Sequence, residues 1–328
     1  MNSKLQAAIK RADLMSIIRS FFTEKGVLEV ETPLLSRASG MDPWIDVFET
    51  QNFVDGVEAS QIKKQSLYLN TSPEFHMKRL LCEGFPDCFQ ISKAFRCGET
   101  GPRHQWEFTI LEWYRLGYDS ISLQAEVEQL LVLVGFSLPA LKITWRELYQ
   151  NNCHFDPIHV SIEDLEKFIE AQNLAPLNRS QSENSFEFKE SLLDYILVSI
   201  IEPKLGFEGP LWVEKYPAHQ AALAKTWIDD EGLAWAHRFE LYIEGVELAN
   251  GYWELTDVHD QRSRFKADQT KRLELAKRPL KIDEEFLSAL DEGLPDCSGI
   301  AIGLDRLLML KTQSSVIQDV LLFHNDNC

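Results

Sequence analysis

The segment from Phe89 to Leu116 constrains the fold of this chain more than any other. Its flanks, residues 88–95 and 107–116, alternate and are rich in aromatic and β-branched residues, which predicts the two strands of a hairpin. The connection, residues 96–106, holds two glycines, a proline, a histidine and two arginines. A turn needs no such charge, whereas planar guanidinium groups match the oxygens of a polyphosphate. We favour an ATP-like ligand here; an ordinary core hairpin with a solvated tip is the alternative.

The returning strand should present Phe108, Ile110, Glu112 and Tyr114 on one face, because side chains alternate along a strand. That face combines a flat aromatic ring, a carboxylate and a phenol in line. The combination suits a nucleotide together with a substrate that bears an amine.

Composition narrows the functional class. The chain has 328 residues, of which 45% are hydrophobic and 26% are charged, and no apolar run approaches the roughly 20 residues of a membrane span. The N-terminal segment shows helical spacing without a secretory layout, and we expect a folded helix. Six scattered cysteines form no CxxC pair, which disfavours zinc and a disulfide framework and makes the cytosol the simplest compartment. A net charge of −18 argues against broad nucleic-acid affinity.

The remaining patterns predict an α+β fold, a mostly antiparallel sheet flanked by helices, because hairpins recur without strand–helix–strand alternation. Ser72 is expected to cap a helix that has Pro73 in its first position. Further expected helices are 120–134, 161–172, 190–201, 257–277 and 304–312. Further expected strands are 27–33, 48–69 around a turn at 55–56, 211–213, 236–243, 246–249 and 299–303. Residues 140–210 carry no motif that indicates chemistry.

A second motif contains Glu247 and Glu254, which are seven residues apart and would face opposite sides of a regular strand. Asn250 and Gly251 between them form a dipeptide typical of a bulge or tight turn, which would bring both carboxylates to one side. Paired carboxylates on a sheet that also carries arginines suit Mg²⁺ held between protein and phosphate oxygens. Two solvated acids are the alternative.

A third motif places Gly299, Ala301 and Gly303 on one strand face, where small residues let a flat ligand lie against the backbone. Asp305 and Arg306 then open a helix, so that Arg306 lies near a positive helix end suited to a phosphate. A tightly packed strand–helix corner is the alternative.

Together these stretches resemble the signature motifs of class II aminoacyl-tRNA synthetases. The strand ending at Pro33 resembles motif 1, which lies at the dimer interface in that family; FRCGE with RHQWEFTILEWY resembles motif 2, and GIAIGLDRL resembles motif 3. TSPEFHMKRLL and GVELANGYWEL are similar to the lysine-type subgroup. The likeness covers nearly the whole chain and is weakest at 135–210. It implies one catalytic domain over residues 1–328, with a helical insertion of unknown role at about 135–210, and a homodimer.

Two departures from the lysine subgroup are informative. The chain starts one helix before motif 1, which leaves no room for an N-terminal anticodon-binding OB domain, and Ala301 replaces the middle glycine of motif 3. Both features resemble the elongation factor P (R)-β-lysine ligases, which activate β-lysine with ATP and attach it to a lysine of that factor. A third difference is that Glu99 follows one residue later than the family's motif 2 glutamate, where this chain has Gly98. A minimal enzyme that charges a tRNA or small carrier with lysine, and a non-catalytic regulatory paralogue, are the alternatives.

The resemblance also implies roles for individual residues. Arg96 on the α-phosphate and Arg306 on the γ-phosphate would be the catalytic pair. The ATP site would comprise Arg96, Glu99, His104, Gln105, Phe108, Glu247, Leu248, Gly303 and Arg306. The substrate site would comprise Ser72, Pro73, Glu74, Glu112, Tyr114, Asn250, Glu254 and Ala301. Glu247 and Glu254 would hold Mg²⁺.

Two other features suggest less specific roles. The basic run from Arg262 to Lys281 is best explained as a solvated helix face, although it is the first place to look for docking of an acceptor. His159 and His219 have no partner at ligand spacing, and we expect structural roles for both.

Overall fold

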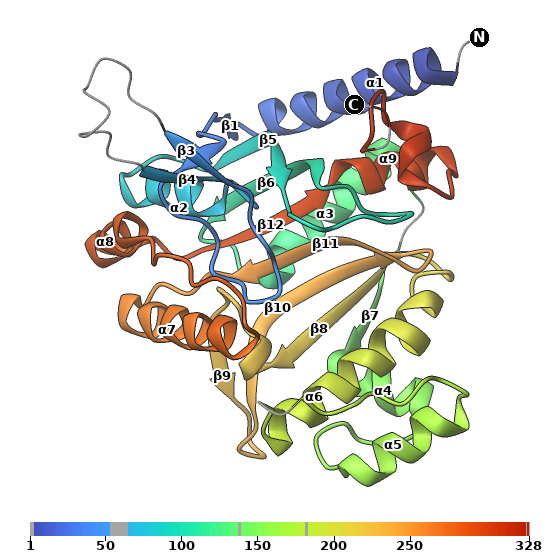
Figure 1. Ribbon diagram of the computed structural model, residues 1–328. Helices are drawn as coiled ribbons and strands as arrows, with labels where there is room; N and C mark the ends of the chain where they lie inside the picture. The colour runs from blue at the N-terminus through green and yellow to red at the C-terminus, as the bar shows by residue number, and fades with distance from the viewer. Residues whose placement is uncertain (1–2, 53–64, 137–138, 181–182, 326, 328) are drawn as a thin grey trace. The chain divides into compact units, whose positions relative to one another are not determined.

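The computed structural model describes residues 3–52, 65–136, 139–180, 183–325 and 327 (Figure 1). The chain divides into two compact units, Met1–Phe136 with Gly251–Cys328, and Ser137–Asn250. Strand β11 (Val246–Trp253) crosses the boundary between them. The expected turn at 55–56 lies outside the described residues.

The sheet of the first unit is built on the predicted hairpin. β5 (Cys88–Phe95) and β6 (Glu107–Leu116) pair antiparallel, β12 (Cys297–Gly303) pairs antiparallel with β6, and β1 (Leu28–Glu29) pairs parallel with β5. A second, antiparallel sheet has the order β2 (Leu35–Ser36), β4 (Gln65–Leu69) and β3 (Glu49–Asn52). β6 is buried along most of its length, as expected for a strand with neighbours on both sides.

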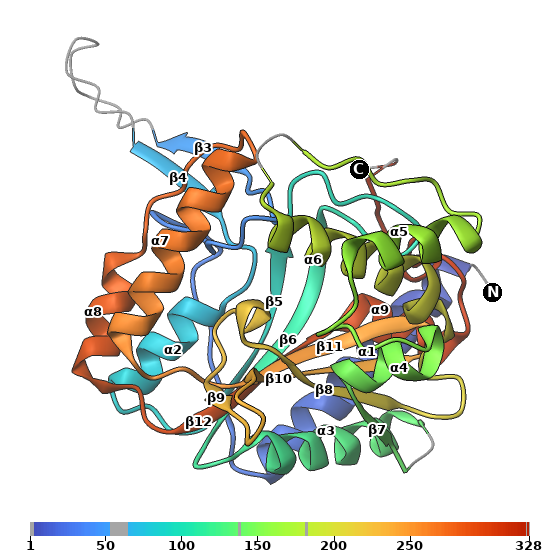
Figure 2. The same cartoon turned by 90° about the horizontal axis from the view of Figure 1, so that it is seen from below.

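Helices pack around this sheet. They are α1 (Ser3–Glu24), α2 (Glu74–Cys82), α3 (Ser120–Val134), α7 (Val258–Glu274), α8 (Glu284–Gly293) and α9 (Leu304–Thr312). Phe22 of α1 stacks on Phe89 of β5 with ring centroids 4.4 Å apart and meets Trp113 of β6 edge-on at 5.2 Å. These aromatic contacts anchor α1 to the hairpin. Helices α2, α7 and α8 lie side by side, as Figures 1 and 2 show.

The second unit has its own strands and helices. Its strand order is β11, β10 (Ala234–Ile243), β8 (Leu211–Pro217) and β7 (Leu141–Thr144), with β9 (Thr226–Ile228) paired to β10. Its α-helices are α4 (Trp145–Cys153), α5 (Ile162–Ala171) and α6 (Ser185–Ile196). Of the described pairings, only β1–β5 and β7–β8 are parallel. The predicted α+β fold with a mostly antiparallel sheet is therefore confirmed.

Several predicted boundaries differ from the structure. The strand expected at 27–33 is confined to Leu28–Glu29, and the helix expected from Glu190 begins at Ser185, because the Asn184 side chain caps it. β11 runs through Asn250 and Gly251, so of the two alternatives given for this dipeptide the tight turn is wrong, and the bulge stays a prediction. Pro73, and not Ser72, is the residue before α2, although the Ser72 hydroxyl does accept a hydrogen bond from the Glu74 amide at 3.0 Å. None of the helices in the described part of the chain has both the length and the apolar character that crossing a membrane requires.

Candidate active site

The register of the central strands places the third motif, on β12, beside the hairpin. Gly299 pairs with Tyr114 and Ala301 pairs with Glu112 across β12 and β6. Paired residues on antiparallel strands project to the same side of a sheet. The small residues of β12 therefore lie beside the carboxylate and the phenol that the sequence placed on one face.

Gly299 is required by its neighbours. A Cβ atom at this position would overlap the Tyr114 ring and would lie 2.6 Å from the Glu254 Oε1 atom. The space that we expected a ligand to use at Gly299 is thus filled by two side chains of the protein. At Gly303 the nearest atom to an added Cβ is a carbon of the Arg306 side chain at 3.6 Å, which is ordinary contact.

A stability test follows from these two glycines. Gly299→Ala should lower the free energy of unfolding by about 1–3 kcal/mol, because the new methyl group displaces the buried Tyr114 ring and Glu254. Gly303→Ala, on the same strand face, is the matched control and should change stability by less than about 1 kcal/mol. Urea denaturation of both variants measures the difference. Equal stability of the two variants would contradict the packing described here.

Carboxylates gather around one end of this face. The Ser72 hydroxyl donates to Glu112 Oε1 at 2.6 Å. Lys78 of α2 lies with its Nζ atom 2.5 Å from Glu74 and 2.6 Å from Glu254. Glu112 and Glu254 are 3% and 1% exposed, so water screens these charges little. All of these residues except Lys78 were predicted from the sequence as parts of the site.

Burial strongly perturbs Glu112. Desolvation, followed by the charge of Glu74, raises the pKa of Glu112 to about 8, although the hydrogen bond from Ser72 opposes the shift. Glu112 Oε2 is buried and has no hydrogen-bond partner within the described part of the chain. Gln90 pairs with Glu112 across β5 and β6 and is also buried. A buried acceptor without a donor is costly, and an ammonium group would satisfy it.

The predicted nucleotide residues converge at the other end of the hairpin. The Arg96 guanidinium lies 5.1 Å from the Phe108 ring centroid and 3.8 Å from the Glu99 carboxylate. Arg306 Nη2 lies 2.6 Å from His104 Nε2. Burial, and then neighbouring arginines led by Arg306, lower the pKa of His104 to about 4, which keeps its ring neutral at pH 7. Two guanidiniums, a flat ring and a neutral imidazole form a site suited to a polyphosphate and a base.

The backbone around Arg306 is fixed by the residue before it. Asp305 is 2% exposed and accepts a hydrogen bond from the Thr109 amide of β6 at 2.7 Å. Its other oxygen pairs with Arg11 of α1. Gln105 is also held, because its Oε1 atom accepts from the Asn325 amide at 2.9 Å. The buried Asp305 carboxylate of α9 thus contacts both α1 and the strand β6 of the hairpin.

The remaining predicted residues belong to the second unit. Glu247 is half-buried, Leu248 is buried, and Asn250 Nδ2 lies 3.4 Å from Glu240 Oε1. Glu240, which the sequence analysis did not single out, also accepts from the Tyr216 and Tyr242 hydroxyls at 2.5 and 2.7 Å. Asn250 Oδ1 is buried and has no hydrogen-bond partner among the described residues. This network orients the amide so that its oxygen is available to a donor.

The two glutamates proposed for Mg²⁺ are in different units, Glu254 in the first and Glu247 in the second. Among the described residues there is no group of three or more histidine, cysteine, aspartate or glutamate side chains that could by itself hold a metal ion. Mg²⁺ commonly takes only one or two carboxylates and completes its coordination with substrate phosphates and water. Glu247 and Glu254 therefore stay a prediction as magnesium ligands.

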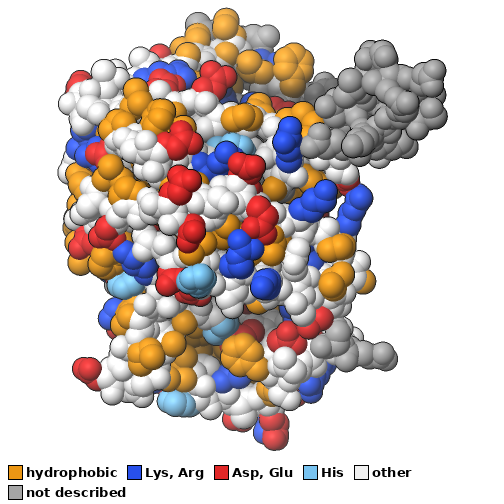
Figure 3. All heavy atoms as spheres, turned by 90° about the vertical axis from the view of Figure 1, so that its left-hand side faces the viewer, with side chains coloured by type: hydrophobic (Ala, Val, Ile, Leu, Met, Phe, Trp, Pro, Cys, Tyr) orange, Lys and Arg blue, Asp and Glu red, His pale blue; other side chains and the backbone are white. Residues whose placement is uncertain are grey.

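The basic run on α7 is largely neutralised within its own unit. Arg262 pairs with Glu284 at 2.7 Å, Arg264 with Asp260 at 2.7 Å, Lys271 with Glu274 at 3.5 Å and Lys277 with Asp46 at 3.2 Å. Figure 3 shows acidic and basic side chains interspersed over the face that carries α7 and α8. The run is a salt-bridged helix face, which favours the simpler of our two explanations. His219 pairs with Glu190 at 2.5 Å, in line with a structural role.

Comparison with known proteins identifies the family. The family model described as tRNA synthetases class II (D, K and N) matches residues 1–327. The elongation factor P–(R)-β-lysine ligase of Salmonella gallinarum is 41% identical over 318 residues, which are 97% of this chain and 94% of the relative. The ligase of the same name from Haemophilus influenzae strain PittGG is 40% identical over 326 residues, covering 99% of this chain and 97% of the relative. This chain therefore belongs to the class II tRNA synthetases, and within them to the family of the elongation factor P–(R)-β-lysine ligases.

Proposed function

We propose that this protein activates (R)-β-lysine with ATP and transfers it to a lysine side chain of elongation factor P. The observation that carries the proposal is the register of Ala301 with Glu112 on a face crowded with carboxylates. Glu74, Glu112 and Glu254 outnumber the one buried ammonium group of Lys78, and this acidic surplus suits an amino acid that brings an ammonium group of its own. The methyl group of Ala301 occupies the position where α-amino acid enzymes of this type have glycine. The names of the relatives point to the same amino acid and the same acceptor.

The first step is adenylation. A carboxylate oxygen of the amino acid attacks the α-phosphorus of ATP, the bond from that phosphorus to the bridging oxygen breaks, and pyrophosphate leaves with the electron pair. Arg96 would bind the α-phosphate and Arg306 the γ-phosphate, while Phe108 stacks on adenine. The carboxylate is already ionised at neutral pH, so no strong base is needed, and orientation and charge neutralisation supply the rate.

The nucleotide site gains further support from the groups around Arg96. Glu99 holds the guanidinium from one side and Phe108 from another, which limits its rotation. His104, Gln105, Leu248 and Gly303 would line the nucleotide. Glu247 and Glu254 would hold Mg²⁺, which adds positive charge beside the phosphates when it is bound.

The second step forms an amide. The neutral amine of the acceptor lysine attacks the carbonyl carbon of the adenylate, the bond to the phosphate oxygen breaks, and AMP leaves as the amine gives up a proton. Ser72, Pro73, Glu74, Tyr114 and Asn250 would surround the amino acid during this transfer. Elongation factor P as acceptor is a proposal that rests on the relatives, and it implies that the protein works in the cytoplasm.

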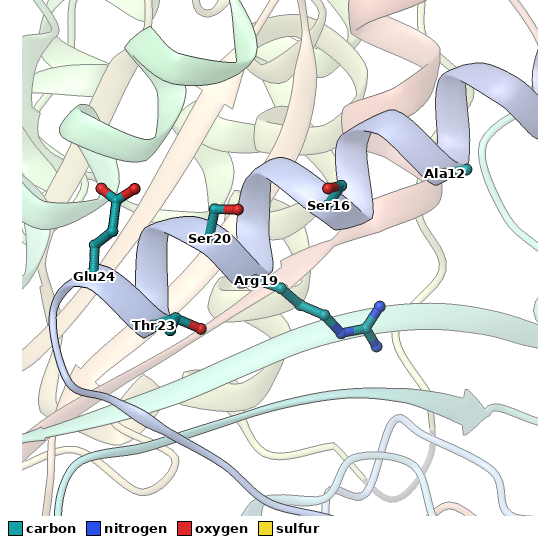
Figure 4. A pocket seen from close by; sticks show the side chains of 6 residues that line it. All are labelled: Ala12, Ser16, Arg19, Ser20, Thr23 and Glu24. Carbon is teal, nitrogen blue, oxygen red and sulfur yellow. The ribbon is translucent and has the colours of Figure 1, made fainter.

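A homodimer is part of the proposal. Pro33, Leu34 and Leu35, just before and within β2, are exposed, as is Leu28 of β1. A hollow of about 450 Å³ runs along α1, and Figure 4 shows it lined by side chains of that one helix. Its lining residues are Ala12, Ser16, Arg19, Ser20, Thr23 and Glu24. Exposed apolar residues and a groove along an exposed helix suit close approach of a second copy, and light scattering of the purified protein tests it.

Pyrophosphate exchange tests the central claim. Purified protein with ATP, Mg²⁺ and (R)-β-lysine should exchange labelled pyrophosphate faster than with α-lysine. Mass spectrometry should then find elongation factor P, and not tRNA, carrying the added residue. A charged tRNA would favour the minimal lysine-activating enzyme instead, and the absence of exchange with any lysine isomer would contradict activation altogether.

Ala301→Gly should relax the choice of amino acid. Removing the methyl group opens the space beside the α-carbon, so the preference for β- over α-lysine should shrink by the equivalent of about 1–3 kcal/mol. The measurement is the ratio of kcat/KM for the two amino acids in pyrophosphate exchange. An unchanged ratio would show that Ala301 does not set this selectivity.

A further inference from the structure

The buried lysine of α2 is unusual in its surroundings. Lys78 is 1% exposed, and lysine is seldom buried this deeply without a partner. Its Nζ atom lies 2.5 Å from Glu74 Oε1, 2.6 Å from Glu254 Oε2 and 6.0 Å from the Tyr114 ring centroid. Each of these three neighbours is a proposed substrate-binding residue, whereas Lys78 itself has been assigned no role.

A contribution to stability alone is a poor explanation for a buried lysine between two glutamates. Removing two charges from water costs about as much as their attraction returns, and apolar replacements of buried ion pairs are often neutral or stabilising. A single ammonium with three donors does, however, fix the relative positions of the groups that it contacts. Here it joins Glu74, in the first turn of α2, to Glu254, which follows β11 far along the sequence.

The position of Glu254 is constrained from the other side as well. Its Oε1 atom lies so close to Gly299 that a Cβ atom there would be 2.6 Å away, while Oε2 faces Lys78. The carboxylate is therefore held between β12 and the lysine. Glu112 is different, since its Oε1 atom accepts from the neutral Ser72 hydroxyl instead of facing a cation, and its Oε2 atom is buried with no hydrogen-bond partner among the described residues.

We propose that Lys78 is a positioning residue of the amino-acid site: its ammonium fills the space between Glu74 and Glu254, holds both carboxylates in place, and leaves Glu112 for an ammonium group of the substrate. This inference rests on the proposed function and deepens it. In this arrangement the protein supplies one of the cations that its acidic site requires, and the ligand supplies the remainder.

Chemical rescue tests the proposal directly. Lys78→Ala removes three carbons and the ammonium, a fragment that n-propylammonium matches in size and charge. We expect the KM for (R)-β-lysine to rise on the order of 100-fold, since displaced binding groups misplace the substrate, while the KM for ATP stays within about threefold. Added n-propylammonium should restore much of the loss, whereas 1-propanol should not. Lys78→Met, whose side chain fills the same space, should show the defect without rescue.

Arg115→Met is the matched control for loss of a nearly buried cation. Arg115 bridges Asp87 at 2.9 Å and Glu126 at 3.3 Å, just as Lys78 bridges two acids, but none of these groups belongs to the proposed substrate site. This variant should lose stability in thermal unfolding. It should keep its KM for the amino acid, and n-propylammonium should have no effect on it.

Two results would overturn the role of Lys78. One is a folded Lys78→Ala protein with the KM of the wild type, and the other is a raised KM that n-propylammonium leaves unchanged. If Lys78→Ala does not fold, the KM of Lys78→Met decides, and a wild-type value overturns the proposal. Calorimetric measurement of (R)-β-lysine binding separates the proposed function from the proposed role of Lys78. Wild type that neither binds it nor releases pyrophosphate refutes the proposed function, while equal binding by wild type and variant refutes only the role of Lys78.

Discussion

Arg96→Ala will slow adenylate formation by about 10²- to 10³-fold, as judged by pyrophosphate exchange at saturating ATP and amino acid. Arg96 sits where β5 ends, and its guanidinium is held against Phe108 at 5.1 Å and beside Glu99 at 3.8 Å. A preorganised donor of this kind needs no rearrangement as negative charge grows on the α-phosphate. Its removal should therefore affect kcat more than the KM for ATP.

The matched control for this prediction is Arg103→Ala. Arg103 lies in the same loop and is exposed, so its removal changes the charge of the loop by the same amount. We expect a less than fivefold effect, because an exposed cation is screened by water. Similar losses of exchange rate in the two variants would mean that the total charge of the loop, and not the position of the Arg96 side chain, matters for the reaction.

Glu112→Gln will raise the KM for (R)-β-lysine about 10- to 100-fold, since a hydrogen bond to a charged group contributes about 1.5–3 kcal/mol. Gln has the same size and keeps an acceptor for Ser72, so the variant should fold. Glu107→Gln is the control, because Glu107 is on the same strand but is exposed and pairs with Lys93 at 3.2 Å. Initial rates over a range of amino-acid concentrations give both KM values.

The raised pKa of Glu112 should make the stability of the protein depend on pH. Burial and the charge of Glu74 hold this pKa at about 8, above its ordinary value of 4.5, so the folded protein keeps a proton that the unfolded chain loses. The resulting stabilisation is complete below about pH 4.5 and is lost as the pH rises towards 8. Relative to Glu112→Gln, the wild type should lose up to about 1.4 kcal/mol of stability per pH unit in this window.

Ligand binding should reverse the protonation of Glu112. An ammonium group favours the ionised carboxylate, so binding at pH 7 should release about one proton in the wild type and none in Glu112→Gln. Calorimetry in buffers of different ionisation enthalpy counts these protons. Binding that releases no proton in the wild type would show that Glu112 is not the residue that meets the substrate's ammonium.

The sequence predicted the parts of the site whose signals are local. Alternation and aromatic content gave both strands of the hairpin and the face that carries Glu112 and Tyr114, and the helix at 304–312 was located from the small strand before it. The strand pairing of β12 with β6 then brought these segments together. No sequence pattern stated that register.

Residues whose roles depend on distant partners were missed. Lys78 is four residues after Glu74, a spacing that signals a helical ion pair, but its burial depends on Glu254, which lies far along the chain. The role of Glu240 was missed because one of its tyrosine donors, Tyr216, comes from the separate strand β8. At Asn250 and Gly251 strand pairing overrode the turn tendency of the dipeptide, as sheet context commonly does.

The buried carboxylate of Asp305 connects the first helix of the chain to the proposed nucleotide site. One of its oxygens accepts from the Thr109 amide and the other pairs with Arg11. Removing the chain up to and including Arg11 would therefore leave a buried carboxylate without its ion pair at the residue that precedes Arg306. Affinity tags or fusions that unwind α1 should therefore impair nucleotide use even though they touch no ligand. If Arg306 binds the nucleotide as proposed, α1 supports the reaction through this one ion pair.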